Sequence, residues 1–179
     1  MRTPRLLTLL ALTACGGGGG IEPATAPPRI LTSGTTYDVS VANESDAGAV
    51  VIRAAPEIAW IALPGVFQAL EIAPKHIDSG QKIMGNVDHS VRRRLGGEPL
   101  SIYLNCGSSM SGPIANNYDV KLSVISQLHP AEEGRTLIRS RVAATARSRE
   151  GTSSSSVQCG TTGRLEARIA ELLNRSVGQ

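Results

Sequence analysis

The sequence predicts an α+β fold in which a two-layer arrangement places helices on one face of an antiparallel sheet. Two observations predict it. Several segments alternate apolar and polar residues, as half-buried strands do, and the longest alternation covers residues 118–128. Residues 56–72 and 164–176 instead repeat apolar residues at helical spacing. A sheet with one apolar face and amphipathic helices can bury each other's apolar surface, which favours two layers.

The first predicted strands come from the N-terminal part of the domain. Residues 35–43 and 49–53 flank a turn-rich segment, so we expect them to pair as a hairpin. Residues 75–90 are predicted to form two short strands around the turn Asp78-Ser79-Gly80.

Between these strands, residues 56–72 are predicted to be helical. Pro56 suits the first helical position, and Glu57 lies near the positive end of the helix dipole. We expect Pro64-Gly65 to kink the helix or divide it into two, because proline removes a helical hydrogen bond. The apolar stripe favours the core over the wall of a ligand pocket, and consists of Trp60, Leu63, Phe67 and Leu70.

Three consecutive arginines, Arg92, Arg93 and Arg94, form the most basic stretch of the chain. Guanidinium groups suit contacts with phosphate, lipid headgroups or an acidic partner, so these residues are candidate anion or partner contacts. A solvated loop at the end of a strand is the favoured alternative. Residues 101–117 are predicted to be a long irregular connection, which is usually either functional or held in place by a cross-link.

The second half of the chain contains the clearest hairpin and a terminal helix. A strand at residues 118–128 is followed by a turn and a matching strand whose inward residues are Ile138, Val142, Ala144 and Ala146. Its outward stripe of Arg139, Arg141, Arg147 and Arg149 is interpreted as a solvated face that discourages edge aggregation. The helix at residues 164–176 is expected to pack across the sheet, with Glu171 and Arg175 as an ion pair. A membrane-surface helix is the alternative, although its polar face mixes both charge signs.

The N-terminus indicates where the protein resides. Arg2 and Arg5 precede a short apolar run, which is typical of a cleavable secretory signal and is too short to span a bilayer. The run ends in Leu12-Thr13-Ala14-Cys15, which resembles the lipobox of bacterial lipoproteins. The resemblance implies removal of the signal peptide, residues 1–14, and lipidation of Cys15 with acyl chains such as palmitate. More than one chain gives stable anchoring, so we expect a lipid-anchored cell-envelope protein, on the periplasmic side of the outer membrane.

The expected role of the remaining cysteines depends on this location. Three are present, and lipidation uses Cys15, which leaves Cys106 and Cys159. In an oxidising envelope this pair is expected to form a disulfide bond worth roughly 3 to 4 kcal/mol. A nucleophilic Cys106, or a metal site with both cysteines, is the alternative, but no CxxC or HxxxH spacing supports it. His76, His89 and His129 fall in different segments.

Composition limits the function classes. After the tether at residues 15–33, residues 34–179 suit one α+β domain. The signal peptide contains two of the 18 basic residues and none of the 15 acidic residues, so its removal leaves a chain whose positive and negative charges nearly balance. Nucleic-acid binding, which requires a basic surface, is therefore not indicated. Neither a phosphate-loop motif nor a Gly-x-Ser-x-Gly elbow occurs. We expect no cofactor and no metal.

The order of elements resembles the helix-grip domains of the lipoprotein subunit of the outer-membrane β-barrel assembly machinery, and also uncharacterised envelope lipoproteins. This similarity concerns element order and transfers no activity. The favoured function is a non-enzymatic binding or scaffold domain with an envelope protein as partner. The alternative is a small-ligand-binding or hydrolytic domain with a site between helix and sheet.

Overall fold

The computed structural model describes residues 30–32, 35–37, 49–148 and 156–178. The described chain belongs to two units. One holds a pair of short antiparallel strands, β1 (Ile30–Thr32) and β2 (Thr35–Tyr37). The other holds the described residues from 49 onward, with the main sheet and its helices. The signal segment, Cys15 and Arg149 lie outside the described residues.

The second unit is built on an antiparallel sheet with the strand order β4-β5-β11-β12-β13-β8. A further strand, β3 (Ala49–Ile52), pairs with the first part of β12. The sheet and its helices confirm the predicted α+β class. The other bounds are β4 (His76–Asp78), β5 (Ile83–Val91), β8 (Leu104–Asn105), β11 (Asp119–Pro130), β12 (Thr136–Arg147) and β13 (Ser156–Thr161).

The β11–β12 hairpin forms the centre of the sheet and confirms the strongest strand prediction. The two strands pair from Asp119 opposite Arg147 to Pro130 opposite Thr136, around the short helix η1 (Glu132–Gly134). Alternate side chains on one face are buried, as the period-two pattern requires. Buried on β11 are Val120, Leu122, Val124, Ser126 and Leu128; buried on β12 are Ile138, Ser140, Val142, Ala144 and Ala146. The two serines bond to each other at 2.8 Å within this face.

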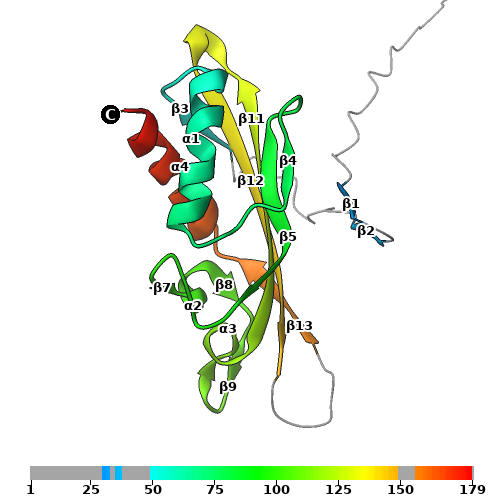
Figure 1. Ribbon diagram of the computed structural model, residues 1–179. Helices are drawn as coiled ribbons and strands as arrows, with labels where there is room; N and C mark the ends of the chain where they lie inside the picture. The colour runs from blue at the N-terminus through cyan, green and yellow to red at the C-terminus, as the bar shows by residue number, and fades with distance from the viewer. Residues whose placement is uncertain (1–29, 33–34, 38–48, 149–155, 179) are drawn as a thin grey trace, which may run out of the picture. The chain divides into compact units, whose positions relative to one another are not determined.

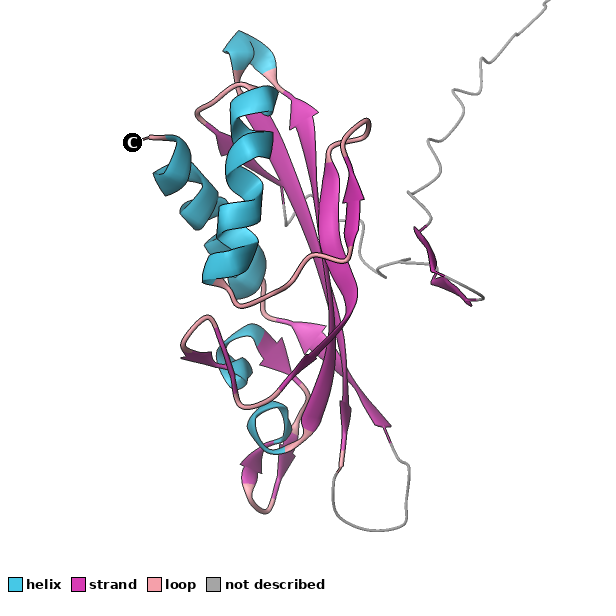
Figure 2. Cartoon of the chain, viewed as in Figure 1, coloured by secondary structure: helices cyan, strands magenta, loops and turns pink. Residues whose placement is uncertain are grey.

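Two long helices, α1 (Pro56–Ala69) and α4 (Arg164–Val177), cover the same face of the sheet and lie side by side (Figures 1 and 2). The apolar stripe predicted for α4 is buried at Leu165, Ile169 and Leu173. The Glu171–Arg175 ion pair is present at 3.3 Å. This arrangement buries the inner faces of both helices against the apolar face of the sheet.

The predicted division of α1 into two helices is wrong, since the helix runs continuously through Pro64. Pro64 lies on the exposed side of the helix, so its ring does not disturb the packing against the sheet. The helix ends at Ala69 rather than at residue 72, and Glu71 then takes a left-handed backbone conformation with φ 59°. Leu63 and Phe67 are fully buried as predicted, whereas Trp60 is only partly buried.

The predicted pairing of the first two strands is also wrong. β2 pairs with β1, whereas β3 pairs with β12, from Ala49 opposite Arg139 to Ile52 opposite Thr136. Residues 38–43 of the predicted strand lie outside the described residues. Alternation of apolar residues identifies a strand and its buried face but not its partner.

Residues 94–117, which we call the Cys106 lobe, are not the irregular connection predicted for most of this stretch. They form short elements: β6 (Arg94–Leu95), β7 (Glu98–Pro99), α2 (Leu100–Tyr103), β8, β9 (Ser108–Ser109), β10 (Gly112–Pro113) and α3 (Ile114–Asn117). β8 joins the lobe to β13, a strand that the sequence also left unpredicted. Elements of two to four residues are too short to show a hydrophobic period.

Candidate ligand-binding pocket

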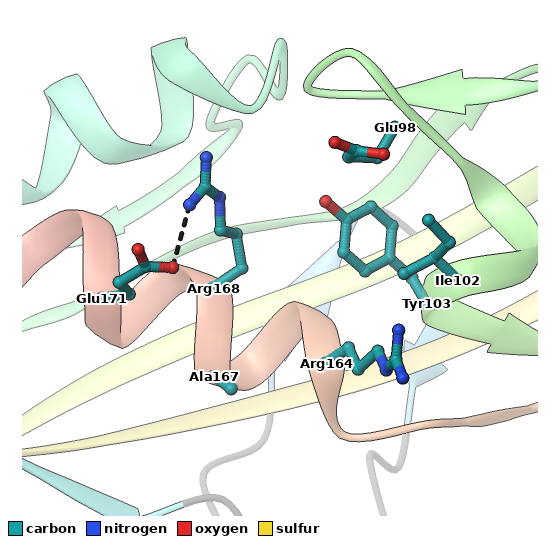
Figure 3. Close-up of a pocket in the computed structure, with 7 residues that line it drawn as sticks. All are labelled: Glu98, Ile102, Tyr103, Arg164, Ala167, Arg168 and Glu171. Atoms are coloured by element: carbon teal, nitrogen blue, oxygen red, sulfur yellow. Dashed lines mark hydrogen bonds and ion pairs between the residues drawn. The ribbon is translucent and has the colours of Figure 1, made fainter.

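A surface pocket of about 480 Å³ lies between the Cys106 lobe and the first half of α4 (Figure 3). The lobe contributes Glu98 of β7 and two residues at the end of α2, and α4 contributes residues spaced along one face. The lining residues are Glu98, Ile102, Tyr103, Arg164, Ala167, Arg168 and Glu171. Charged side chains of both signs therefore surround an apolar and aromatic base.

The start of α4 is held against α2 by Thr162. Its hydroxyl donates to the carbonyl oxygens of Ile102 at 2.7 Å and of Tyr103 at 3.1 Å. Its backbone N–H also donates to the Tyr103 carbonyl, at 2.9 Å. Gly163 comes next with φ 78°, a left-handed conformation that glycine adopts without strain, and the helix begins at the next residue. These bonds fix the two walls of the pocket relative to each other.

Tyr103 forms the base of the pocket and is 3% exposed. Its hydroxyl points between Arg168 and Glu98 (Figure 3). Burial raises the pKa of the phenol; the Arg168 charge opposes this rise and the Glu98 charge adds to it. The hydroxyl therefore stays protonated at neutral pH and can both donate and accept a hydrogen bond.

The charged groups on the walls divide into paired and unpaired ones. Arg168 bonds to Glu171 at 2.8 Å, and Glu171 also pairs with Arg175 at 3.3 Å. The hydrogen bond from Arg168 is the main cause that lowers the pKa of the Glu171 carboxyl. Among the residues that the structure describes, Glu98 and Arg164 have no ion-pair partner. These two groups are the ones available to a charged ligand.

The three arginines predicted as anion contacts do not line this pocket. Arg92 pairs with Asp119 at 3.0 Å, and Arg94 donates to the Gly97 carbonyl at 2.8 Å. Arg93 has φ 62°, and its carbonyl accepts a hydrogen bond from the Leu100 N–H. Two of the three guanidinium groups thus bond within the protein: Arg92 links the end of β5 to β11, and Arg94 supports the turn that leads into α2.

Cys106 and Cys159 lie at the junction of the lobe and the sheet. Their sulfur atoms are 2.02 Å apart, at disulfide distance, and the two residues are 53 positions apart in sequence. Both are buried. A bond here ties the lobe to β13 and so supports the lobe wall of the pocket.

The three histidines do not come together. His76 lies on the edge strand β4, while His89 and His129 lie on β5 and β11. Burial is the main cause that lowers the pKa of both His89 and His129. Within residues 49–148 and 156–178 no group of three or more His, Cys, Asp or Glu side chains is placed to hold a metal ion. Nor is any helix in these ranges long and apolar enough to cross a bilayer.

Sequence reasoning missed this pocket. The helical spacing of α4 could have placed Arg164 and Arg168 on its polar face. Tyr103 and Glu98, however, fall in or beside the segment predicted to be irregular, and no periodicity links them to α4. Comparison of the chain with protein-family models, with curated proteins and with solved structures gives no match.

Proposed function

We propose that the chain is a lipid-anchored cell-envelope protein whose folded domain binds a ligand or partner without catalysing a reaction. The lipobox at residues 12–15 supports the anchor, on the periplasmic side of the outer membrane. The two helices laid on one face of the antiparallel sheet support the helix-grip-like arrangement that element order suggested.

The observation that carries a binding role is the pocket beside Tyr103. It is a surface hollow of about 480 Å³ that is largely open to solvent and has room for a small molecule. The Tyr103 ring lies between the carboxylate of Glu98 and the guanidinium of Arg164 (Figure 3). A ligand with a cationic and an anionic group, such as an amino acid or a short peptide, could pair with both and contact the small exposed part of Tyr103.

Calorimetry with the purified full chain tests this ligand class. A zwitterionic dipeptide is expected to bind, whereas its N-acetylated form loses the contact with Glu98 and its amidated form loses the contact with Arg164. The Glu98→Gln variant should no longer distinguish the free dipeptide from its N-acetylated form. The Arg164→Gln variant should no longer distinguish it from its amidated form. Glu132→Gln, at an exposed turn outside the pocket, is the matched control. Equal binding of all three ligands would contradict the assignment.

The anchor is tested separately in cells. Cys15→Ala should abolish incorporation of labelled palmitate and release the protein from the membrane fraction. A lipidated, membrane-bound Cys15→Ala protein would refute the anchor.

An envelope protein is the other candidate occupant of the domain. Crosslinking in intact cells, followed by pull-down, should recover one dominant partner in that case. Loss of this partner on replacement of Arg92, Arg93 and Arg94 by Ala would assign the contact to the arginine loop.

A further inference from the structure

The helix α1 is apolar on its inner side and exposes two isoleucines on its outer side, beside the exposed polar residues Glu57 and Gln68. Its only charged residue is Glu57, in the first turn. The inner side is buried on the sheet, but Ile58 is 55% exposed and Ile61 is 79% exposed on the opposite side. Gly65 continues this outer ridge, with nothing within 4 Å of the position that a Cβ would take. A helix that covers a sheet usually carries polar residues on its outer side, so the outer face of α1 suits an apolar surrounding.

The neighbouring helix α4 is basic on its outer side. Arg164, Arg168 and Arg175 reach solvent, and the only other exposed charge on this helix is Glu171. Glu166 is 8% exposed and accepts the Thr161 hydroxyl at 2.8 Å, so it takes no part in this face. Because α1 and α4 pack side by side, an apolar ridge lies next to a basic row.

The negative charge of α1 is compensated locally. Glu57 pairs with Lys82, from the turn between β4 and β5, at 3.6 Å. On α4 itself, three arginines stand against one exposed carboxylate, Glu171, so the outer side of this helix has an excess of positive charge. An excess of this sign next to exposed isoleucines complements a surface that is anionic outside and apolar beneath.

We propose that the outer face of α1 and α4 docks on an anionic phospholipid bilayer. Ile58 and Ile61 enter the interface and Arg175 meets lipid phosphates, whereas Arg164 and Arg168 line the neighbouring pocket. The inference rests on the proposed function, because the acyl chains on Cys15 would hold the domain beside such a surface. It also modifies the membrane-surface alternative considered for α4: the apolar side of α4 is buried on the sheet, so α1 supplies the apolar contact.

Other occupants fit this face less well. A second copy in a two-fold dimer would bring the same basic residues into the shared interface, where like charges repel. Two exposed isoleucines also give far less apolar contact than the area of about 800 Å² that each partner buries in a stable protein interface. Binding to a bilayer does not require such an area, because the electrostatic attraction to anionic lipids already holds the protein there and each inserted apolar side chain adds to the binding energy.

Vesicle binding of the full chain carrying Cys15→Ser tests the proposal, since this chain has no lipid. Binding is expected to vesicles of phosphatidylcholine with phosphatidylglycerol, to weaken with added salt, and to be absent on phosphatidylcholine alone. Ile58→Ser combined with Ile61→Ser should weaken binding by at least about tenfold. Arg175→Gln, which lies outside the pocket, should weaken binding by about fivefold.

Matched controls distinguish binding through this face from nonspecific binding through any exposed apolar or basic residue. Ile77→Ser changes an isoleucine that is 58% exposed on the edge strand β4 and should leave vesicle binding unchanged. Arg141→Gln should have the same neutral result, because Arg141 lies between the inward-facing Ser140 and Val142 of β12 and is therefore on the sheet face opposite the two helices. Unchanged circular dichroism of each variant establishes that the fold is retained.

Three results would overturn the proposal: no binding to anionic vesicles, equal losses in the control variants, or an α1 variant that changes a dimer to a monomer without changing vesicle binding. The last result would assign the face to self-association. None of these results bears on the lipid anchor, which is tested separately by fractionation of the Cys15→Ala variant. Conversely, a result that refuted the anchor would not change the vesicle binding measured with the unlipidated chain.

Discussion

The sheet with its two long helices and the Cys106 lobe are stabilised by different means. In the sheet body, β11 and β12 pair over twelve residues each and bury a continuous apolar face under α1 and α4. The lobe consists of elements of two to four residues. It relies more on side-chain hydrogen bonds, such as those from Asn117 Nδ2 to the carbonyls of Ser111 at 2.9 Å and Pro113 at 3.1 Å, and on its contact with Cys159.

The difference shows why the pocket lies where these two regions meet. The body supplies α4, whose first turn is held by packing, and the lobe supplies Tyr103 and Glu98. The charged side chains of the pocket, such as Glu98 and Arg164, do not serve the core, and they face each other where the two regions join. Loosening the lobe should therefore damage the pocket before it damages the sheet.

The largest effect is expected from a cavity in the body. Phe67→Ala removes a fully buried ring from the inner face of α1 and should lower the free energy of unfolding by about 3 to 5 kcal/mol. Urea denaturation followed by circular dichroism measures the loss. Gln68→Ala, at the adjacent exposed position, should change stability by less than about 0.5 kcal/mol. Equal effects of the two variants would mean that α1 does not pack as described.

Removal of the cross-link should act mainly on the lobe. Cys106→Ser combined with Cys159→Ser is expected to cost about 3 kcal/mol, because the unfolded chain regains the freedom of a long loop. Hydrogen exchange should show lost protection first at α2 and α3, with β11 and β12 retained. Mass spectrometry of unreduced protein from an oxidising compartment provides the control, since two free thiols there would contradict the disulfide.

A smaller effect is expected from the polar contacts inside the lobe. Asn116 accepts the Ser101 N–H at 2.9 Å and donates to the Ser101 hydroxyl at 2.9 Å. Asn116→Ala leaves these partly buried groups without their partner and should cost about 1 to 2 kcal/mol. Binding of the pocket ligand should weaken as well, because Ser101 lies in α2 beside Ile102. Unchanged ligand affinity in a destabilised variant would show that lobe and pocket are independent.

The smallest effect concerns pH and the sheet body. The pKa of His129 is lowered, first by burial and then by the Arg139 charge, and burial also lowers that of His89. The unfolded chain, with histidine pKa values near about 6.5, therefore takes up protons first. Stability should be complete above that pH and decline as the pH falls through the lowered folded values. His89→Gln combined with His129→Gln should flatten this dependence in thermal melts between about pH 7 and 5; an unchanged slope would exclude these groups as its cause.

The sequence correctly predicted a helix or strand where the residues of that segment alone show the hydrophobic periodicity. The alternation of residues 118–128, and the spacing of Leu165, Ile169 and Leu173, required only local repetition. Prediction failed for β3, whose partner lies more than eighty positions away in β12, and for the lobe. The arginine triplet was conspicuous in sequence, yet Arg92 and Arg94 mainly bond within the protein.

The sequence by itself determined the α+β class, the central hairpin and the terminal helix, because each follows from a pattern within a short contiguous stretch, and the location of the protein stays a prediction. Tertiary structure alone decided the partner of β3, the order within the lobe, the meeting of Tyr103 with Arg164 and Arg168, and the exposure of Ile58 and Ile61 beside a basic helix. The physical reason is that periodicity reports which side of an element is apolar, whereas pairing and exposure depend on which distant surfaces remain to be covered once the chain has folded.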